Sequence, residues 1–267
     1  MLTTRFVTGA PNWIDVGTPD LDGAASFYGD LFGWRFLPSG PGTGGYGVFE
    51  RDGRAVAGGM RTTAEQNPPA WTVYFHSPDA AATAEAVERT GGRVLARPSA
   101  VTDEGTMALL ADKAGVPFGV WQPAAMKGFD LAGEPGSLCR VELHTRDVPA
   151  AAAFYAAVFG WETYGVPFPG GTYTTVCPAG AEEDAMFGGL VPLAPTGPGA
   201  TGRTGEDACW LPYFEVTDAD ATAARARELG GRVHEPATDV PGVGRPAHLT
   251  DPYGARFAVI RTDPERG

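Results

Sequence analysis

The feature that most constrains this chain is an internal duplication. The stretch DVPAAAAFYAAVFGW, residues 147–161, repeats DLDGAASFYGDLFGW, residues 20–34, and the two Phe-Tyr pairs lie 127 positions apart. A repeat of this length within 267 residues predicts that the chain is built from two similar halves, each with the same order of elements.

Each copy predicts a short amphipathic helix. Asp20 and Asp147 stand where an N-cap carboxylate accepts hydrogen bonds from the first turn, and Gly33 and Gly160 follow where a left-handed C-cap residue is favoured. Apolar residues recur between them at helical spacing, so we expect both helices to pack on sheets, with their Phe-Tyr pairs in the core. These apolar residues are Leu21, Ala25, Tyr28, Phe32, Val148, Ala152, Tyr155 and Phe159.

Short strand patterns around these helices predict the order β-α-β-β-β twice in each half. The strand signal WTVYFH at 71–76 is echoed by WLPYFEV at 210–216, and the helix after each ends at a Gly-Gly pair, 139 positions apart. The twelve extra residues of the second half fall in a longer hairpin and in the Gly/Pro/Thr-rich segment 192–207, which we expect to be a mobile loop. We therefore predict an α+β protein with domains at 1–125 and 137–267, joined by a linker at 126–136.

Composition excludes several classes of function. The net charge of −12 argues against a nucleic-acid or anionic-membrane partner, because there is no basic footprint. No apolar run approaches the roughly 20 residues needed to cross a bilayer, and the N-terminus has no secretory signal pattern. Three cysteines are poor support for a disulfide framework. We expect a cytoplasmic protein, as a monomer or homodimer.

The order of motifs resembles the vicinal oxygen chelate superfamily, which includes glyoxalases, bleomycin-resistance proteins and ring-cleaving dioxygenases. The resemblance rests on the repeated D…FY…FGW helix and on the turn DPYG at 251–254 before a last strand. WIDVGTPD at 13–20 with FGVWQP at 118–123 is similar to a tandem subgroup from actinomycetes, described as glyoxalase-like or as hydroxylases and sometimes associated with aromatic polyketide biosynthesis. The resemblance implies two cup-shaped sheets, each able to hold a metal with its substrate or a bound drug.

The resemblance also implies where metal ligands would stand, on the first, fifth and last strands of each half. None of the corresponding positions carries His or Glu, although a site of two histidines and one carboxylate needs all three. We therefore predict that the inherited metal site is absent and that no cofactor is bound. These positions are Trp13, Thr72 and Gly119 in the first half, and Arg140, Leu211 and Ala258 in the second.

Strand alternation selects the candidate site residues, because every second side chain faces the same side of a sheet. The candidate catalytic residues are Asp15, His76, Glu142 and His144, with either carboxylate as base and the histidines or Tyr74 as donors. The candidate ligand-binding residues are Trp13, Tyr74, Trp121, Arg140, Tyr213 and Glu215. His234 and His248, near strand ends, are weaker candidates.

Two of these assignments have alternatives that the sequence leaves open. Glu142, His144 and Glu215 could meet as a displaced metal site or an acid/base pair, or Glu142 and His144 could form a purely structural pair. Trp121 beside Gly119 could stack on a flat ligand, or could fill the space itself.

The function that fits these features is metal-free binding of a small hydrophobic, aromatic molecule, such as a polyketide-type metabolite, in a sheet cup. A modifying enzyme would be a metal-independent oxygenase, hydroxylase or lyase, and the choice between enzyme and binding protein stays open. The alternatives are a metal-dependent glyoxalase- or dioxygenase-type enzyme with displaced ligands and a non-catalytic drug-binding resistance protein.

Overall fold

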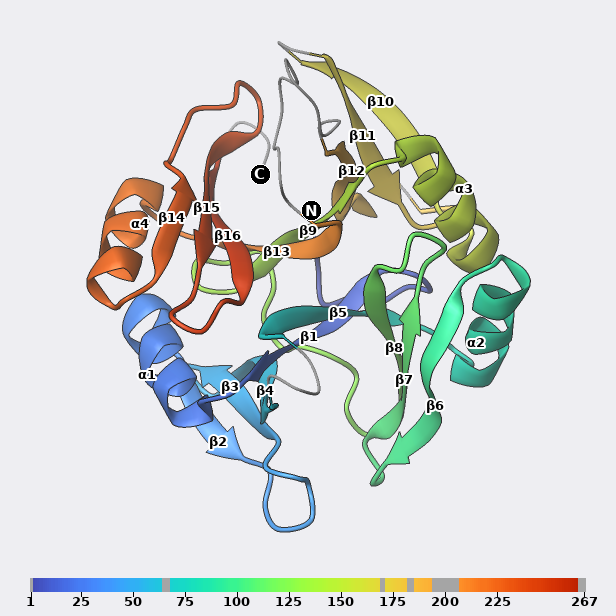
Figure 1. The fold of residues 1–267 in the computed structure, drawn as a ribbon, viewed down its shortest axis with the longest axis horizontal. Helices are drawn as coiled ribbons and strands as arrows, with labels where there is room; N and C mark the ends of the chain where they lie inside the picture. Colours follow the sequence, from blue (N-terminus) through green and yellow to red (C-terminus); the bar gives the residue numbers. More distant parts are fainter. Residues whose placement is uncertain (1, 64–67, 169–170, 182–184, 194–206, 264–267) are drawn as a thin grey trace.

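The chain folds into two eight-stranded sheets, one from each half (Figure 1). The computed structural model describes residues 2–63, 68–168, 171–181, 185–193 and 207–263. The expected mobile loop at 192–207 therefore lies largely outside the described residues. No helix in the described ranges is long and apolar enough to cross a membrane.

Within these described ranges, each half contributes eight strands and two helices. The first contains β1 (Pro11–Thr18), α1 (Leu21–Phe32), β2 (Arg35–Pro38), β3 (Gly47–Arg51), β4 (Arg54–Arg61), β5 (Ala70–His76), α2 (Ala80–Arg89), β6 (Arg93–Val101), β7 (Gly105–Ala111) and β8 (Pro117–Pro123). The second contains β9 (Leu138–Thr145), α3 (Val148–Phe159), β10 (Glu162–Phe168), β11 (Gly171–Cys177), β12 (Gly188–Pro192), β13 (Cys209–Glu215), α4 (Ala219–Glu228), β14 (Arg232–Glu235), β15 (Gly244–Thr250) and β16 (Arg256–Thr262).

The strand order is the same in both sheets, β2-β3-β4-β1-β5-β8-β7-β6 in the first and β10-β11-β12-β9-β13-β16-β15-β14 in the second. Within the first, β1 lies antiparallel to β5, while β4 is parallel to β1 and β8 is parallel to β5. Each sheet is thus two β-α-β-β-β modules that meet at their first strands. The predicted α+β class and its tandem organisation are confirmed.

The duplicated helices begin and end where the sequence predicts. The Asp20 carboxylate accepts from the Gly23 amide at 3.1 Å, and the Asp147 carboxylate accepts from the Ala150 amide at 2.9 Å. Gly33 ends α1 with a φ of 76°, a left-handed conformation that glycine adopts without a steric penalty. The same capping at both ends of α1 and α3 explains why the two copies have equal lengths.

One hydrophobic core joins the two halves. It includes the inner faces of β1 and β5 and those of β9 and β13, and Phe75 of β5 packs edge-on against Trp210 of β13 with ring centroids 5.0 Å apart. Figure 1 shows α1 beside α4 and α2 beside α3, so each helix pair spans the two halves. The opposite, concave faces of the sheets are the two cups.

The tyrosine of each Phe-Tyr pair links one half to the other. The Tyr28 hydroxyl donates to the Asp251 carboxylate at 3.0 Å and accepts from the Trp71 indole N–H at 3.1 Å. In the second copy, the Tyr155 hydroxyl bonds in the same way to Asp112 and to Trp210 (3.4 and 3.0 Å). The repeated motif therefore does more than pack a helix, since it also satisfies a buried carboxylate across the domain boundary.

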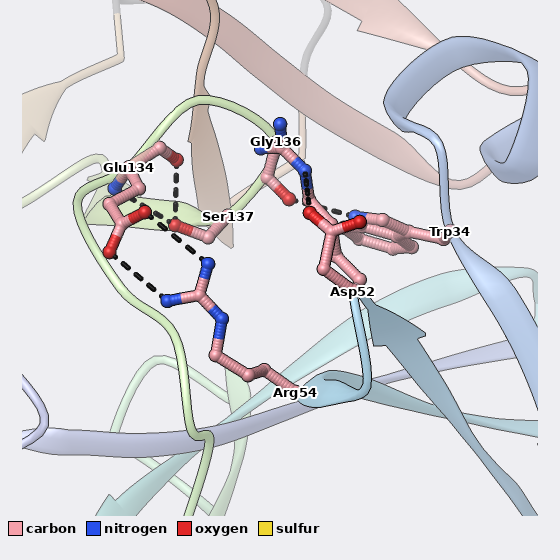
Figure 2. Close-up of polar contacts among 7 residues, drawn as sticks. Trp34, Asp52, Arg54, Glu134, Gly136 and Ser137 are labelled. Atoms are coloured by element: carbon pink, nitrogen blue, oxygen red, sulfur yellow. Dashed lines mark hydrogen bonds and ion pairs between the residues drawn. The ribbon is translucent and has the colours of Figure 1, made fainter.

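The connection at 126–136 is packed on the first half rather than free. Figure 2 shows the Trp34 indole donating to the Gly136 carbonyl at 2.7 Å and Arg54 paired with Glu134 at 3.3 Å. Phe129 of this segment is almost fully buried, and its amide donates to the Asn12 carbonyl. These contacts give the predicted linker a fixed course.

Candidate functional sites in the two cups

Strand register brings the candidate residues of each half into one cross-strand row. Trp13 of β1 lies opposite Tyr74 of β5, which in turn lies beside Gly119 of β8. The matching row in the second half is Arg140, Tyr213 and Ala258. Tyr74 therefore pairs with the first-strand residue of its half, in place of the expected Thr72. In the same way, Tyr213 pairs with Arg140 in place of the expected Leu211.

The N-terminal cup contains a buried carboxylate with a perturbed pKa. The Tyr74 hydroxyl donates to Asp15 at 2.9 Å, and the Trp13 indole N–H donates to the Tyr46 hydroxyl at 2.7 Å. Burial raises the pKa of Asp15 to about 6, although hydrogen bonds from Tyr74 and Thr72 oppose the rise. Asp15 is therefore a carboxylate that gains and loses a proton near neutral pH.

The space beside Gly119 is filled rather than open. A Cβ atom at Gly119 would lie 2.1 Å from the Tyr74 ring, so that ring covers the glycine. Trp121 is buried, and its indole N–H donates to the Met126 carbonyl at 3.0 Å. The suggestion that Gly119 leaves room for a flat ligand is wrong for this conformation, because the missing side chain is replaced by the neighbouring phenol.

The C-terminal cup is built around Glu142. Its two carboxylate oxygens accept from the Tyr173 hydroxyl at 2.7 Å and the Tyr213 hydroxyl at 2.6 Å. The Arg140 guanidinium carbon lies 5.8 Å from the centroid of each of these two rings. His144 is fully buried, with its Nε2 3.6 Å from a Glu142 oxygen.

These neighbours keep Glu142 ionised. Burial alone would raise its pKa, but the adjacent His144, the charge of Arg140 and the hydrogen bond from Tyr213 outweigh burial and hold the pKa well below its usual range. The equivalent residue in the first half, Asp15, has Trp13 in place of a cation. The pKa of the buried carboxylate is therefore raised in the N-terminal cup and lowered in the C-terminal cup.

A second polar group adjoins Glu142. The Tyr213 hydroxyl lies 2.8 Å from Nε2 of His248, whose Nδ1 lies 2.7 Å from the Glu235 carboxylate. Tyr46, Tyr173 and Glu235 were not among the sequence-based candidates. Tyr46 and Tyr173 lie 127 positions apart, the offset of the Phe-Tyr pairs, and that coincidence could have identified them.

His76 and Glu215 do not join these groups. Each lies on a strand antiparallel to the first strand of its half, so it is carried away from Asp15 or from His144. Glu215 instead accepts from the Thr262 amide at 2.9 Å, and burial lowers the pKa of His76. The expectation that Glu215 meets Glu142 and His144 is wrong, because Glu142 is paired with residue 211 of β13.

A cavity of about 510 Å³ lies outside both cups, where the turn at 112–116 of the first half meets the start of α3. The cups themselves are largely filled by their own side chains, since Trp13, Tyr74, Trp121 and Tyr213 are all buried. A ligand in either cup must therefore displace side chains or bind at the rim.

Both halves of the chain match one protein superfamily. The model of the Glyoxalase/Bleomycin resistance protein/Dioxygenase superfamily matches residues 10–120 and 137–259. The chain is similar to the anthracycline biosynthesis protein DauV of Streptomyces sp. (strain C5), 39% identical over 96% of this chain and 94% of that protein. It is also similar to the putative glyoxylase CFP32 of Mycobacterium tuberculosis, 37% identical over 98% of both chains.

Two solved structures share the fold. The Mn(II)-bound glyoxalase from Novosphingobium aromaticivorans gives a TM-score of 0.60 at 16% identity, covering 95% of this chain and 83% of that one. The 2,2',3-trihydroxybiphenyl 1,2-dioxygenase from Sphingomonas wittichii gives 0.63 at 15%, covering 97% and 94%. At these identities the likeness shows the fold alone.

The residues at the expected metal positions do not fit a divalent ion. In the first half, the first-strand position is the Trp13 indole, and the fifth-strand position is the Tyr74 phenol or the Thr72 hydroxyl. The last-strand position is a glycine, Gly119. In the second half, Arg140 brings a positive charge to the first-strand position. Among the described residues, no three His, Cys, Asp or Glu side chains are grouped as a metal site requires.

Proposed function

Since the chain belongs to the Glyoxalase/Bleomycin resistance protein/Dioxygenase superfamily, we propose that its C-terminal cup binds an oxygenated aromatic small molecule without a metal. The observation that supports this proposal is the half-buried guanidinium of Arg140, held over the rings of Tyr173 and Tyr213. Within the described residues, its N–H groups donate to no acceptor. A planar cation with unused donors suits a phenolate or carbonyl oxygen.

The surroundings of Arg140 suit an aromatic ligand in particular. Leu211, Ala258 and Ile260 form an apolar cluster on the same cup face, against which a ring system can pack. The ionised Glu142 balances the charge of Arg140, so the cup can accept a neutral or weakly acidic ligand. This combination of apolar floor and paired charges is absent from the N-terminal cup, where Trp13 replaces the arginine.

The relatives support the same ligand class. DauV is named an anthracycline biosynthesis protein, and it covers 96% of this chain at 39% identity. We therefore propose a polyketide-type aromatic as the ligand. In an enzyme, Glu142 would be the base and Tyr213 the proton donor, because both face the space beside Arg140.

The test is a calorimetric titration with a hydroxylated anthraquinone, using the wild type, Arg140→Lys and Trp13→Phe. We expect Arg140→Lys to weaken binding about tenfold, or about 1.4 kcal/mol, because lysine keeps the charge but loses the planar fork. Trp13→Phe, at the equivalent position of the other cup, should bind like the wild type. Equal binding by Arg140→Lys, or a loss confined to Trp13→Phe, would move the site out of the C-terminal cup.

Two alternatives are decided by further measurements. A non-catalytic resistance protein would leave the ligand mass unchanged after prolonged incubation, whereas an enzyme would change it. A metal-dependent enzyme with displaced ligands would carry about one divalent metal per chain when purified without chelator. The geometry does not favour that alternative, since Glu215 lies apart from Glu142 and His144.

A further inference from the structure

A continuous chain of hydrogen bonds runs from the rim of the C-terminal cup to its interior. It joins the Glu235 carboxylate to His248 at 2.7 Å, His248 to Tyr213 at 2.8 Å, and Tyr213 to Glu142 at 2.6 Å. The exposed fraction of the side chain falls from 44% at Glu235 to 13% at His248 and 8% at Glu142. The chain therefore connects solvent with a buried carboxylate.

Proton counting fixes the state of this chain. Three hydrogen bonds between two carboxylates need three hydrogens, and Tyr213 supplies one. The other two come from a doubly protonated His248, from a neutral His248 together with a protonated Glu142, or from a neutral His248 together with a protonated Glu235. The distances alone do not distinguish these three arrangements, but the surroundings of the two carboxylates do.

The neighbours of Glu142 favour its ionised form. Tyr173 donates to the second carboxylate oxygen, and the Arg140 guanidinium lies between the same two rings. Both interactions stabilise negative charge, which agrees with the lowered pKa of Glu142. The Glu235 side chain is 44% exposed, so water solvates its ionised form. With both carboxylates ionised, the two remaining hydrogens belong to His248, which carries a positive charge in this arrangement.

The other groups around His248 are few among the described residues. On β9, the His144 ring stands edge-on at a centroid distance of 6.3 Å, and on β16 the cross-strand neighbour is the uncharged Ala258. Within the described part of the chain, the charged or titratable side chains at this end of the cup include those of Arg140, Glu142, His144, Tyr213 and Glu235, and Arg256 lies on the strand that pairs with the strand of His248.

We propose that Glu235 and His248 form a proton relay that acts through Tyr213 on a ligand in the C-terminal cup. This inference rests on the proposed function. When the Tyr213 hydrogen turns from Glu142 to a ligand oxygen, the Tyr213 O–H bond breaks and a ligand O–H bond forms. The Nε2–H bond of His248 then breaks as the Tyr213 O–H bond re-forms. His248 is left neutral and keeps its Nδ1–H, which donates to the Glu235 carboxylate. A proton from water restores the imidazolium.

In this scheme Tyr213 touches the ligand, while His248 and Glu235 are positioning residues. His248 keeps a proton on Nε2 that can pass to the Tyr213 oxygen, and Glu235 fixes the other ring nitrogen, Nδ1, in its protonated form. No oxidation or reduction is involved, and the net change is the transfer of one proton from water to the ligand.

The first test needs no ligand. Two-bond ¹H–¹⁵N NMR of the four histidines reports which ring nitrogens carry hydrogen. We expect both nitrogens of His248 to be protonated at pH 7.5 in the wild type and only one in Tyr213→Phe or Glu235→Gln. His234→Gln is the matched control, since His234 lies on the neighbouring strand and bonds to the Thr250 hydroxyl. A neutral His248 in the wild type overturns the relay.

The second test uses the absorbance of a bound hydroxyanthraquinone, which distinguishes phenol from phenolate. We expect His248→Gln to raise the pH at which the bound probe ionises by about 1 unit, because a positive charge that stabilises the bound phenolate is lost. An unchanged ionisation, with the probe still bound, overturns the proposal. A probe that fails to bind at all counts against the proposed function, and the NMR result then decides the relay alone.

Discussion

Replacing Asp15 by Asn should stabilise the protein at neutral pH. The folded-state pKa of Asp15 is about 6 against an ordinary value of 3.8, and at 1.36 kcal/mol per pKa unit this difference corresponds to about 3 kcal/mol. Because the folded protein binds the extra proton between these two values, the stability associated with Asp15 falls as the pH rises from about 4 to 6. Asn keeps an acceptor for Tyr74 and cannot ionise.

The assay is urea unfolding followed by tryptophan fluorescence between pH 4 and 8. The free energy of unfolding of Asp15→Asn, minus that of the wild type, should rise by about 3 kcal/mol across this range and be constant above pH 7. A difference that does not change with pH, or that falls as pH rises, would refute the reasoning, because it would mean that burial does not penalise the Asp15 carboxylate.

The equivalent change in the other cup should have the opposite effect. Glu142→Gln removes a carboxylate that Arg140 and two tyrosines stabilise, and it leaves the Arg140 charge without its partner, so we expect a loss of about 3–5 kcal/mol at pH 7. Since the folded pKa of Glu142 is depressed, this contribution is present above the usual value of 4.5 and is lost as pH falls below it. Loss of stability in Asp15→Asn and gain in Glu142→Gln would contradict the account of both cups.

Three further predictions concern the packing at Gly119, the buried hydrogen bond of Tyr28 and the reactivity of the Cys139 thiol. Gly119→Ala should lower the free energy of unfolding by about 1–3 kcal/mol, since its Cβ would meet the Tyr74 ring at 2.1 Å; a variant as stable as the wild type would mean that the ring moves freely. Tyr28→Phe should cost about 1–3 kcal/mol in thermal unfolding, because it strands the buried Asp251 oxygen across the domain boundary, and an unchanged Tm would show that the link is unimportant. Cys139, buried and with a raised pKa, should resist alkylation in the native protein; labelling as fast as in urea would contradict this.

Much of the fold was predictable because its signals are local and duplicated. N-cap aspartates, C-cap glycines and alternating strands each act within a few residues, and the repeat supplied every signal twice. The predicted order of elements implies a strand after α3, but the bounds of β10 were not predicted, since ETYGVPF contains a glycine and a proline that disfavour a strand by composition. Its pairing along the whole of β11 outweighs that preference.

The site was less predictable, because it depends on register between strands far apart in sequence. Alternation placed Glu142 and Tyr213 on one face correctly, but it could not show that the antiparallel pairing of β9 and β13 separates Glu215 from His144. It also could not show that Tyr173, from a hairpin, would reach Glu142. These contacts are set by hydrogen-bonded pairing across the sheet, which no single strand pattern contains.

The contrast between the cups follows from one pair of equivalent positions. Both halves keep an inward carboxylate bonded to the tyrosine of the fifth strand, Asp15 to Tyr74 and Glu142 to Tyr213. Where the first half has Trp13, hydrogen bonds only partly offset the desolvation of the carboxylate and its pKa rises; where the second half has Arg140, the charge is balanced and the pKa falls. A duplicated scaffold has thus produced one cup in which the carboxylate can hold a proton near neutral pH and another in which it stays ionised. Under the proposed function, Arg140 contacts an oxygen of the ligand. A substitution at position 140 should therefore weaken ligand binding in the C-terminal cup and leave the stability of the N-terminal half unchanged.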